Sequence, residues 1–78
     1  MNLVKFKEAI HKDSVRDIDV MKAEGGWMIC ILNGNKERTT KEDCCLYRAR
    51  GGLRVFKTLD AIKALFRSEE IMCKMVVH

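Results

Sequence analysis

Cysteine and histidine side chains are the groups in this 78-residue sequence that could bind a metal or act as nucleophile and base. The four cysteines are Cys30, Cys44, Cys45 and Cys73, and the two histidines are His11 and His78. Zinc sites normally present their ligands as closely spaced pairs such as C-x-x-C. No such pair occurs here, and the histidines lie near opposite ends of the sequence. The spacing therefore predicts neither a metal site nor a bound cofactor.

The cysteines lie among apolar residues, as in Met28-Ile29-Cys30-Ile31 and Met72-Cys73-Lys74-Met75. A free buried cysteine behaves as a small hydrophobic residue, and disulfides are rare in the cytosol. Cys44 and Cys45 are neighbours, so in a strand their side chains would point to opposite faces and could not join one site. We therefore expect four reduced thiols in a cytoplasmic protein.

Other signs of catalysis are weak. Asp17 and Asp19 share one face of a predicted strand, where two carboxylates could act as acid and base, but a solvated strand face is the commoner reason for such a pair. The sequence has no G-x-S-x-G, no glycine-rich phosphate loop before a helix and no H-E-x-x-H. Nothing ties either histidine to a thiol. We therefore expect that this chain is not an enzyme.

Positive charge is concentrated in one third of the chain. The net charge is +4, yet residues 44–67 hold six bases and one acid, while the rest holds nine bases and ten acids. A concentrated basic segment attracts polyanions such as DNA or an acidic protein surface. We do not expect a membrane partner, because no apolar run approaches the ~18 residues that a membrane helix needs.

The glycine pair at residues 51 and 52 predicts a hairpin inside this basic segment, and its register decides which side chains are displayed together. A three-residue loop with a glycine bulge pairs Arg50 with Arg54 and Arg48 with Phe56. Guanidinium groups suit phosphate, and an exposed ring offers a stacking surface. The predicted nucleic-acid- or anion-binding residues are Arg48, Arg50, Arg54 and Phe56, with Lys57 and Lys63 at the rim. In the competing interpretation, Phe56 belongs to the core and the arginines extend around it.

Hydrophobic spacing and turn residues predict the elements that position this hairpin. Residues 3–12 favour a helix, with a strand as the open alternative. Strands are expected over residues 15–23, 27–32, 44–50 and 53–57, of which 27–32 should be central because both its faces are apolar. Turns are expected at Gly25-Gly26 and at Asn33-Gly34-Asn35.

Thr58 is the expected N-cap of a helix after the fourth strand, and residues 71–77 form a last strand or an extended tail. The expected core comprises Trp27, Ile29, Ile31, Ile62, Leu65 and Phe66. These elements give one α+β domain over residues 1–78, with a small antiparallel sheet of four or five strands. The last strand is more apolar than an unprotected edge should be, which predicts a homodimer through that edge.

Two stretches of the sequence carry a resemblance: Glu24-Gly25-Gly26-Trp27, and the run from Leu46 through Arg50-Gly51-Gly52 to Phe56-Lys57-Thr58-Leu59-Asp60-Ala61. They resemble small proteins encoded by bacterial plasmids and prophages, including some described as partition-associated. The second stretch is also similar to the DNA-binding domains of some phage integrases. The resemblance implies a small accessory protein of a mobile element that binds nucleic acid through the basic hairpin. The alternative is a protein-interaction module, such as an inhibitor of a host or defence factor.

Overall fold

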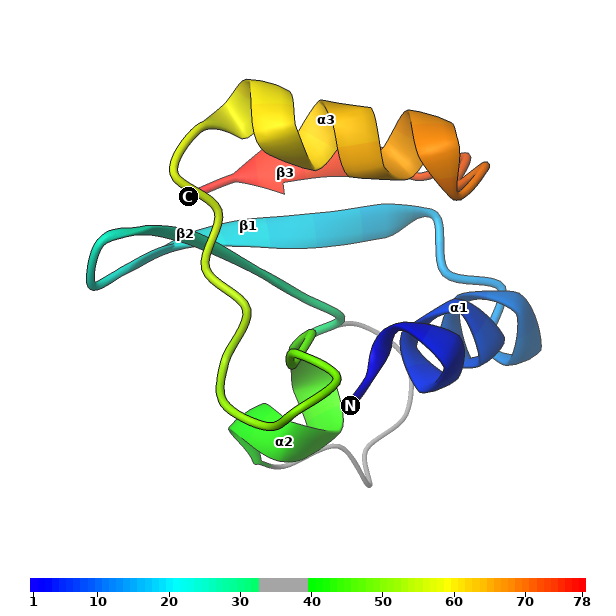
Figure 1. The fold of residues 1–78 in the computed structure, drawn as a ribbon. Helices are drawn as coiled ribbons and strands as arrows, with labels where there is room; N and C mark the ends of the chain where they lie inside the picture. The colour runs from blue at the N-terminus through cyan, green and yellow to red at the C-terminus, as the bar shows by residue number, and fades with distance from the viewer. Residues whose placement is uncertain (33–39) are drawn as a thin grey trace.

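A three-stranded sheet with the strand order β2-β1-β3 forms the centre of the fold (Figure 1). The computed structural model describes residues 1–32 and 40–78, so the turn expected at residues 33–35 lies outside the described residues. β1 (Asp17–Ala23) pairs antiparallel with β2 (Gly26–Cys30) and parallel with β3 (Lys74–Val77). The sheet is therefore mixed, and it is not the antiparallel sheet of four or five strands that we expected.

The middle strand of the sheet is β1, so the prediction that residues 27–32 form the central strand is wrong. The error arises because side chains along β2 point alternately to two faces, and both faces are buried. Ile29 on one face of β2 and Met28 and Cys30 on the other are all buried, because layers of side chains cover the strand above and below. Apolar residues on both faces of a strand indicate that other side chains cover both faces. They do not indicate whether the strand has a neighbouring strand at one edge or at both.

The two long helices form where their apolar spacing predicts, and Thr58 is the N-cap predicted for the second of them. α1 (Leu3–Lys12) is capped by Asn2, whose side chain accepts a hydrogen bond from the N–H of Lys5 (2.9 Å). α3 (Leu59–Ser68) is capped by Thr58, whose hydroxyl accepts from the N–H of Ala61 (3.1 Å). Such caps satisfy N–H groups that the first helical turn leaves unpaired. The helix over residues 3–12 is thus confirmed over the strand alternative.

One main core joins both long helices to one face of the sheet. Its buried members are Phe6, Ile18, Val20, Ile29, Ile31, Leu46, Phe56, Ile62, Phe66 and Ile71. Two expected core residues, Trp27 and Leu65, are only half-buried and pack against it. A smaller cluster of Met28, Cys30, Cys44 and Cys45 lies on the opposite side of the β1–β2 hairpin.

The strands expected over residues 44–50 and 53–57 are wrong. α2 (Lys41–Cys44) is a single helical turn, and the chain after it makes only isolated bridges, at Cys45, Tyr47, Leu53 and Phe56. The physical reason is that neighbouring N–H groups find different partners. Leu46 donates to Ile29 (3.1 Å), while Tyr47 donates to Met1 (2.7 Å), so no continuous ladder can form.

β3 confirms the expected last strand, but it runs parallel to β1. Its C-terminal end is fixed to β1 by His78, whose N–H donates to the Val20 carbonyl (2.9 Å) and whose Nε2 lies 2.8 Å from Asp19. Asp19 is 6 % exposed, so it does not belong to a solvated strand face. Within the described part of the chain, no helix is long and apolar enough to cross a membrane.

Candidate anion-binding turn

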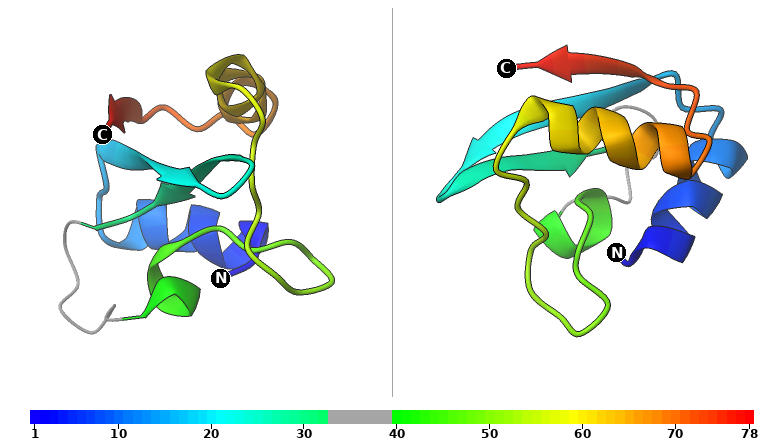
Figure 2. Two further views of the ribbon diagram at one scale, coloured as in Figure 1. Left: turned by 90° about the vertical axis from the view of Figure 1, so that its left-hand side faces the viewer. Right: turned by 45° about the horizontal axis from the view of Figure 1, so that its top comes forward.

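Residues 48–52 form a turn that extends away from the rest of the molecule in both views of Figure 2. Tyr47 and Leu53 form the bridge at its base. Above the bridge, the Arg48 N–H donates to the Gly52 carbonyl (2.9 Å) and the Gly51 N–H donates to the Arg48 carbonyl (3.0 Å). Gly51 and Gly52 have φ values of 89° and 83°, which L residues rarely adopt. The glycine pair is therefore what allows this turn.

The expected hairpin register is wrong. Tyr47 pairs with Leu53, and the Arg54 N–H donates to the Leu46 carbonyl (3.1 Å), so the loop contains residues 48–52 and not residues 51–53. This pairing lets Leu46 enter the main core while Tyr47 and Leu53 pack against the smaller cluster. In the expected register Leu53 would have stood in the loop. Burial of apolar side chains thus decides the register.

The two arginines of the turn have different surroundings. The Arg48 Nε donates to the Gly51 carbonyl (3.2 Å), and its guanidinium folds over Gly52, where a Cβ would lie only 2.6 Å away. Arg48 therefore supports the turn while remaining exposed. Arg50 is also exposed, and no described residue forms a hydrogen bond or ion pair with its side chain. Its guanidinium is open to a partner.

Phe56 lies in the core and not on an exposed face. It is 7 % exposed, and its backbone exchanges two hydrogen bonds of 2.8 Å with Trp27. The Arg54 guanidinium carbon lies 5.0 Å from the centre of the Phe56 ring, a distance typical of a cation–π contact. For this pair the competing interpretation, a core ring with an arginine extended over it, describes the structure. A base cannot stack on a ring covered in this way.

Lys57 and Lys63 are exposed, and Lys63 does not join the arginines. Lys63 belongs to α3, and Figures 1 and 2 place α3 at the opposite end of the molecule from the 48–52 turn. The structure thus places Arg48 and Arg50 on one turn and Arg54 beside Phe56, and it leaves Lys63 on another surface. None of these bases forms an ion pair with an acid in the described part of the chain.

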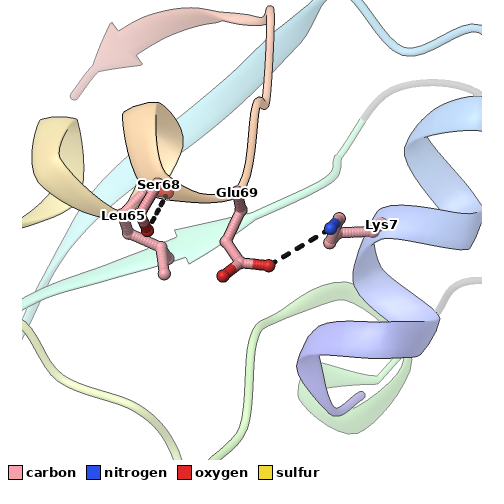
Figure 3. A network of polar contacts seen from close by, with 4 residues as sticks. All are labelled: Lys7, Leu65, Ser68 and Glu69. Carbon is pink, nitrogen blue, oxygen red and sulfur yellow. Dashed lines mark hydrogen bonds and ion pairs between the residues drawn. The ribbon is translucent and has the colours of Figure 1, made fainter.

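The ion pairs that do form lie elsewhere. Figure 3 shows Lys7 reaching from α1 to Glu69 at the end of α3, with 3.1 Å between Nζ and Oε1. The neighbouring Ser68 hydroxyl donates to the Leu65 carbonyl (3.1 Å) within α3. Lys7 and Glu69 both line an open groove of about 270 Å³ between α1 and the segment that follows α3, which also includes Ile71 and Cys73. In this groove Lys7 is paired with Glu69, whereas the arginines of the 48–52 turn have no carboxylate partner among the described residues.

Sequence reasoning missed a group of three thiols. Cys30, Cys44 and Cys45 line one cavity of about 220 Å³, because Cys44 ends α2 and does not lie in a strand. The expectation that the two adjacent cysteines cannot share a site is therefore wrong. All four cysteines are free thiols, and no three His, Cys, Asp or Glu side chains of the described residues are grouped so that they could hold a metal ion.

No protein-family model matches this chain, and no curated protein and no solved structure matches it either. The features that bear on function are therefore those of the molecule itself. They are the protruding basic turn, the thiol cavity, and β3, which among the described strands lies at the edge of the sheet with β1 on one side only.

Proposed function

We propose that this chain is a small non-enzymatic binding domain that contacts nucleic acid through the 48–52 turn. The observation that supports the proposal is the free guanidinium of Arg50 on a protruding turn within a segment of net charge +5. Arginine presents five N–H donors in a planar fork that matches phosphate oxygens. The Arg48 guanidinium, held over Gly52, is a second positive group on the same turn.

The proposed contacts are to phosphate and not to bases. The one aromatic ring of the predicted site, Phe56, is buried, and phosphate contacts alone carry no direct sequence information. Binding should therefore be weak in sequence preference and strongly dependent on salt. The resemblance to plasmid and prophage proteins suggests a setting for this activity, namely maintenance of a mobile element in the bacterial cytoplasm.

Replacing Arg50 with alanine is expected to weaken DNA binding and to lower its salt dependence. Each phosphate contact contributes about 0.9 to the slope of log affinity against log salt concentration for duplex DNA. The loss of one contact should therefore reduce the slope by about one unit. Fluorescence anisotropy with a labelled duplex, measured over a range of salt concentrations, gives this slope directly.

Lys63→Ala is the matched control, because it removes the same charge from α3, at the far end of the molecule. It should leave the slope nearly unchanged. Equal losses in the two variants would mean that only net charge matters, and the turn would then not be the contact surface. A wild-type protein that does not bind DNA at low salt would refute nucleic acid as the partner and favour an acidic protein.

A second candidate function, a protein-interaction module, is favoured by the open side of β3. The N–H groups of Lys74 and His78 point toward β1, so by alternation those of Met75 and Val77 point away from it. Just before this strand, Met72 is 94 % exposed. We propose that a second copy pairs here, strand against strand, about a two-fold axis.

Light scattering should then report the mass of two chains and not that of one 9.0 kDa chain. Val77→Pro, which removes a donor from the open side of β3 and none directed at β1, should lower the dimer fraction. Lys57→Ala, an exposed change away from β3, is the control. A single-chain mass at high protein concentration would rule out this dimer.

A further inference from the structure

Cys30 and Cys45 face each other across an isolated antiparallel bridge. The N–H of Leu46, next to Cys45, donates to the carbonyl of Ile29, next to Cys30 (3.1 Å). On the other side of the pair, the N–H of Ile31 donates to the carbonyl of Cys44 (2.9 Å). The two cysteines therefore occupy a non-hydrogen-bonded pair. In such pairs the Cα atoms are about 4.5 Å apart, within the range of about 4.4–6.8 Å that a disulfide spans.

The thiols are buried, but they line an open cavity of about 220 Å³. Met21 and Met28 form part of its apolar wall, and Lys41 stands at its edge. A small uncharged molecule can enter a cavity of this size. The backbone thus holds both sulfur atoms close together, at a place that a small oxidant can reach.

The surroundings of Cys45 favour its thiolate. The Cys30 thiol donates a hydrogen bond to the Cys45 sulfur, and the positive charges of Lys41 and the Met1 amino group lie nearby. Together these lower the pKa of Cys45, although burial acts in the opposite direction. Thiolates next to positive groups are the reactive form of cysteine.

Cys30 is the complementary partner. Its hydrogen bond to Cys45, its burial and the nearby carboxylate of Asp19 raise its pKa. Cys45 therefore loses its proton at a lower pH than Cys30 does. A pair with this division of roles has one sulfur ready to attack an oxidant and one ready to resolve the product.

We propose that Cys45 and Cys30 are an oxidation site for hydrogen peroxide and that the oxidation ends in a disulfide between them. The Cys45 thiolate attacks one peroxide oxygen, the O–O bond breaks, and the departing hydroxide takes a proton to become water. The Cys30 sulfur then attacks the resulting sulfenic acid, the S–O bond breaks, and a second water leaves with the Cys30 proton. Two thiols are oxidised by two electrons, and one peroxide is reduced to two waters.

The experiment treats the full chain with hydrogen peroxide, blocks the remaining thiols with N-ethylmaleimide and measures the intact mass. We expect a loss of about 2 Da and two blocked thiols, where the untreated chain has four. Trypsin cleaves after Lys22, Lys36, Lys41 and Arg48, which separates Cys30 from Cys45. The two peptides should remain linked until dithiothreitol is added, and fragmentation should place the link at Cys45.

Stability provides an independent measurement. The bond would close a loop of about 15 residues, which should raise the Tm by roughly 10–20 °C. Dithiothreitol should reverse the rise. The comparison uses the same protein before and after oxidation, so it does not depend on any variant folding.

Matched variants separate the pair from the other thiols. Cys30→Ser and Cys45→Ser should lose the cross-link, whereas Cys73→Ser should keep it, because the Cys73 thiol donates to the Val15 carbonyl (3.3 Å) away from this cavity. Cys44→Ser should also keep it. If a variant fails to fold, the cross-linking of the folded wild-type protein is compared instead with that of the wild-type protein denatured in guanidinium chloride.

Three results would overturn the proposal. The first is a link through Cys44 or Cys73 as the main product of the folded protein. The second is over-oxidation of Cys45 while Cys30 stays reduced. The third is a cross-link that forms no faster in the folded protein than in the denatured one, since the fold would then not bring the two sulfurs together.

Discussion

Replacing Gly26 with alanine is expected to lower the free energy of unfolding by about 3 kcal/mol or more, the upper end of the cost of overpacking. A Cβ at this position would lie 2.1 Å from the Phe56 carbonyl oxygen and 2.9 Å from its carbon. Both atoms belong to the backbone, which Trp27 holds through two hydrogen bonds of 2.8 Å. The clash therefore cannot be relieved by turning a side chain. The segment before α3 would have to separate from β2.

Gly25→Ala is the matched control in the same turn. Gly25 has a φ of +87°, but a Cβ there would meet nothing within 4 Å. Its cost should be limited to backbone strain, about 1–2 kcal/mol. Urea denaturation followed by circular dichroism measures both variants. Equal losses would show that the strand and the segment at Phe56 are not in close contact in solution.

Replacing Ile62 with alanine is expected to cost about 2–5 kcal/mol, because Ile62 is fully buried between α3 and the sheet. A 78-residue domain has a total stability of about 4–12 kcal/mol, so a large share of the protein should be unfolded. The midpoint of thermal unfolding should fall by about 8–40 °C, at about 4–8 °C per kcal/mol.

Leu65→Ala is the control, because Leu65 lies on the same helix but is only half-buried. We expect it to cost clearly less than Ile62→Ala. Both substitutions leave a strong helix former at the position, so helix propensity does not explain a difference. A larger loss at Leu65 would mean that α3 packs through a different face.

The two long helices, α1 and α3, and the first hairpin could be predicted from the sequence because their signals are local. Thr58, the spacing of Ile62 and Phe66, and the helical period of residues 3–12 specify α3 and α1 within one or two turns of chain. The Gly25-Gly26 turn likewise joins two strands that are adjacent in sequence. In each case the residues that decide the structure lie within about ten positions of each other.

The sheet order and the thiol cavity could not be predicted because they depend on distant residues. No feature in the sequence of β1 or β3 indicates that the two strands pair in parallel. Cys30 meets Cys45 across a bridge that joins the end of β2 to the residue just after α2. The loop of the basic turn was misjudged for a related reason. Glycines permit several registers, and the burial of Leu46 and Leu53 chooses among them.

The position of β1 between β2 and β3 has a consequence for synthesis on the ribosome. Asp17 pairs with Lys74, so β1 leaves the ribosome long before the strand that completes its second side. At elongation rates of about 5–20 residues per second, this delay lasts roughly 3–11 seconds. During that time β1 in the nascent chain presents unpaired N–H and C=O groups, which can pair with another chain. Newly made molecules are therefore most open to aggregation along the side of β1 that β3 later covers.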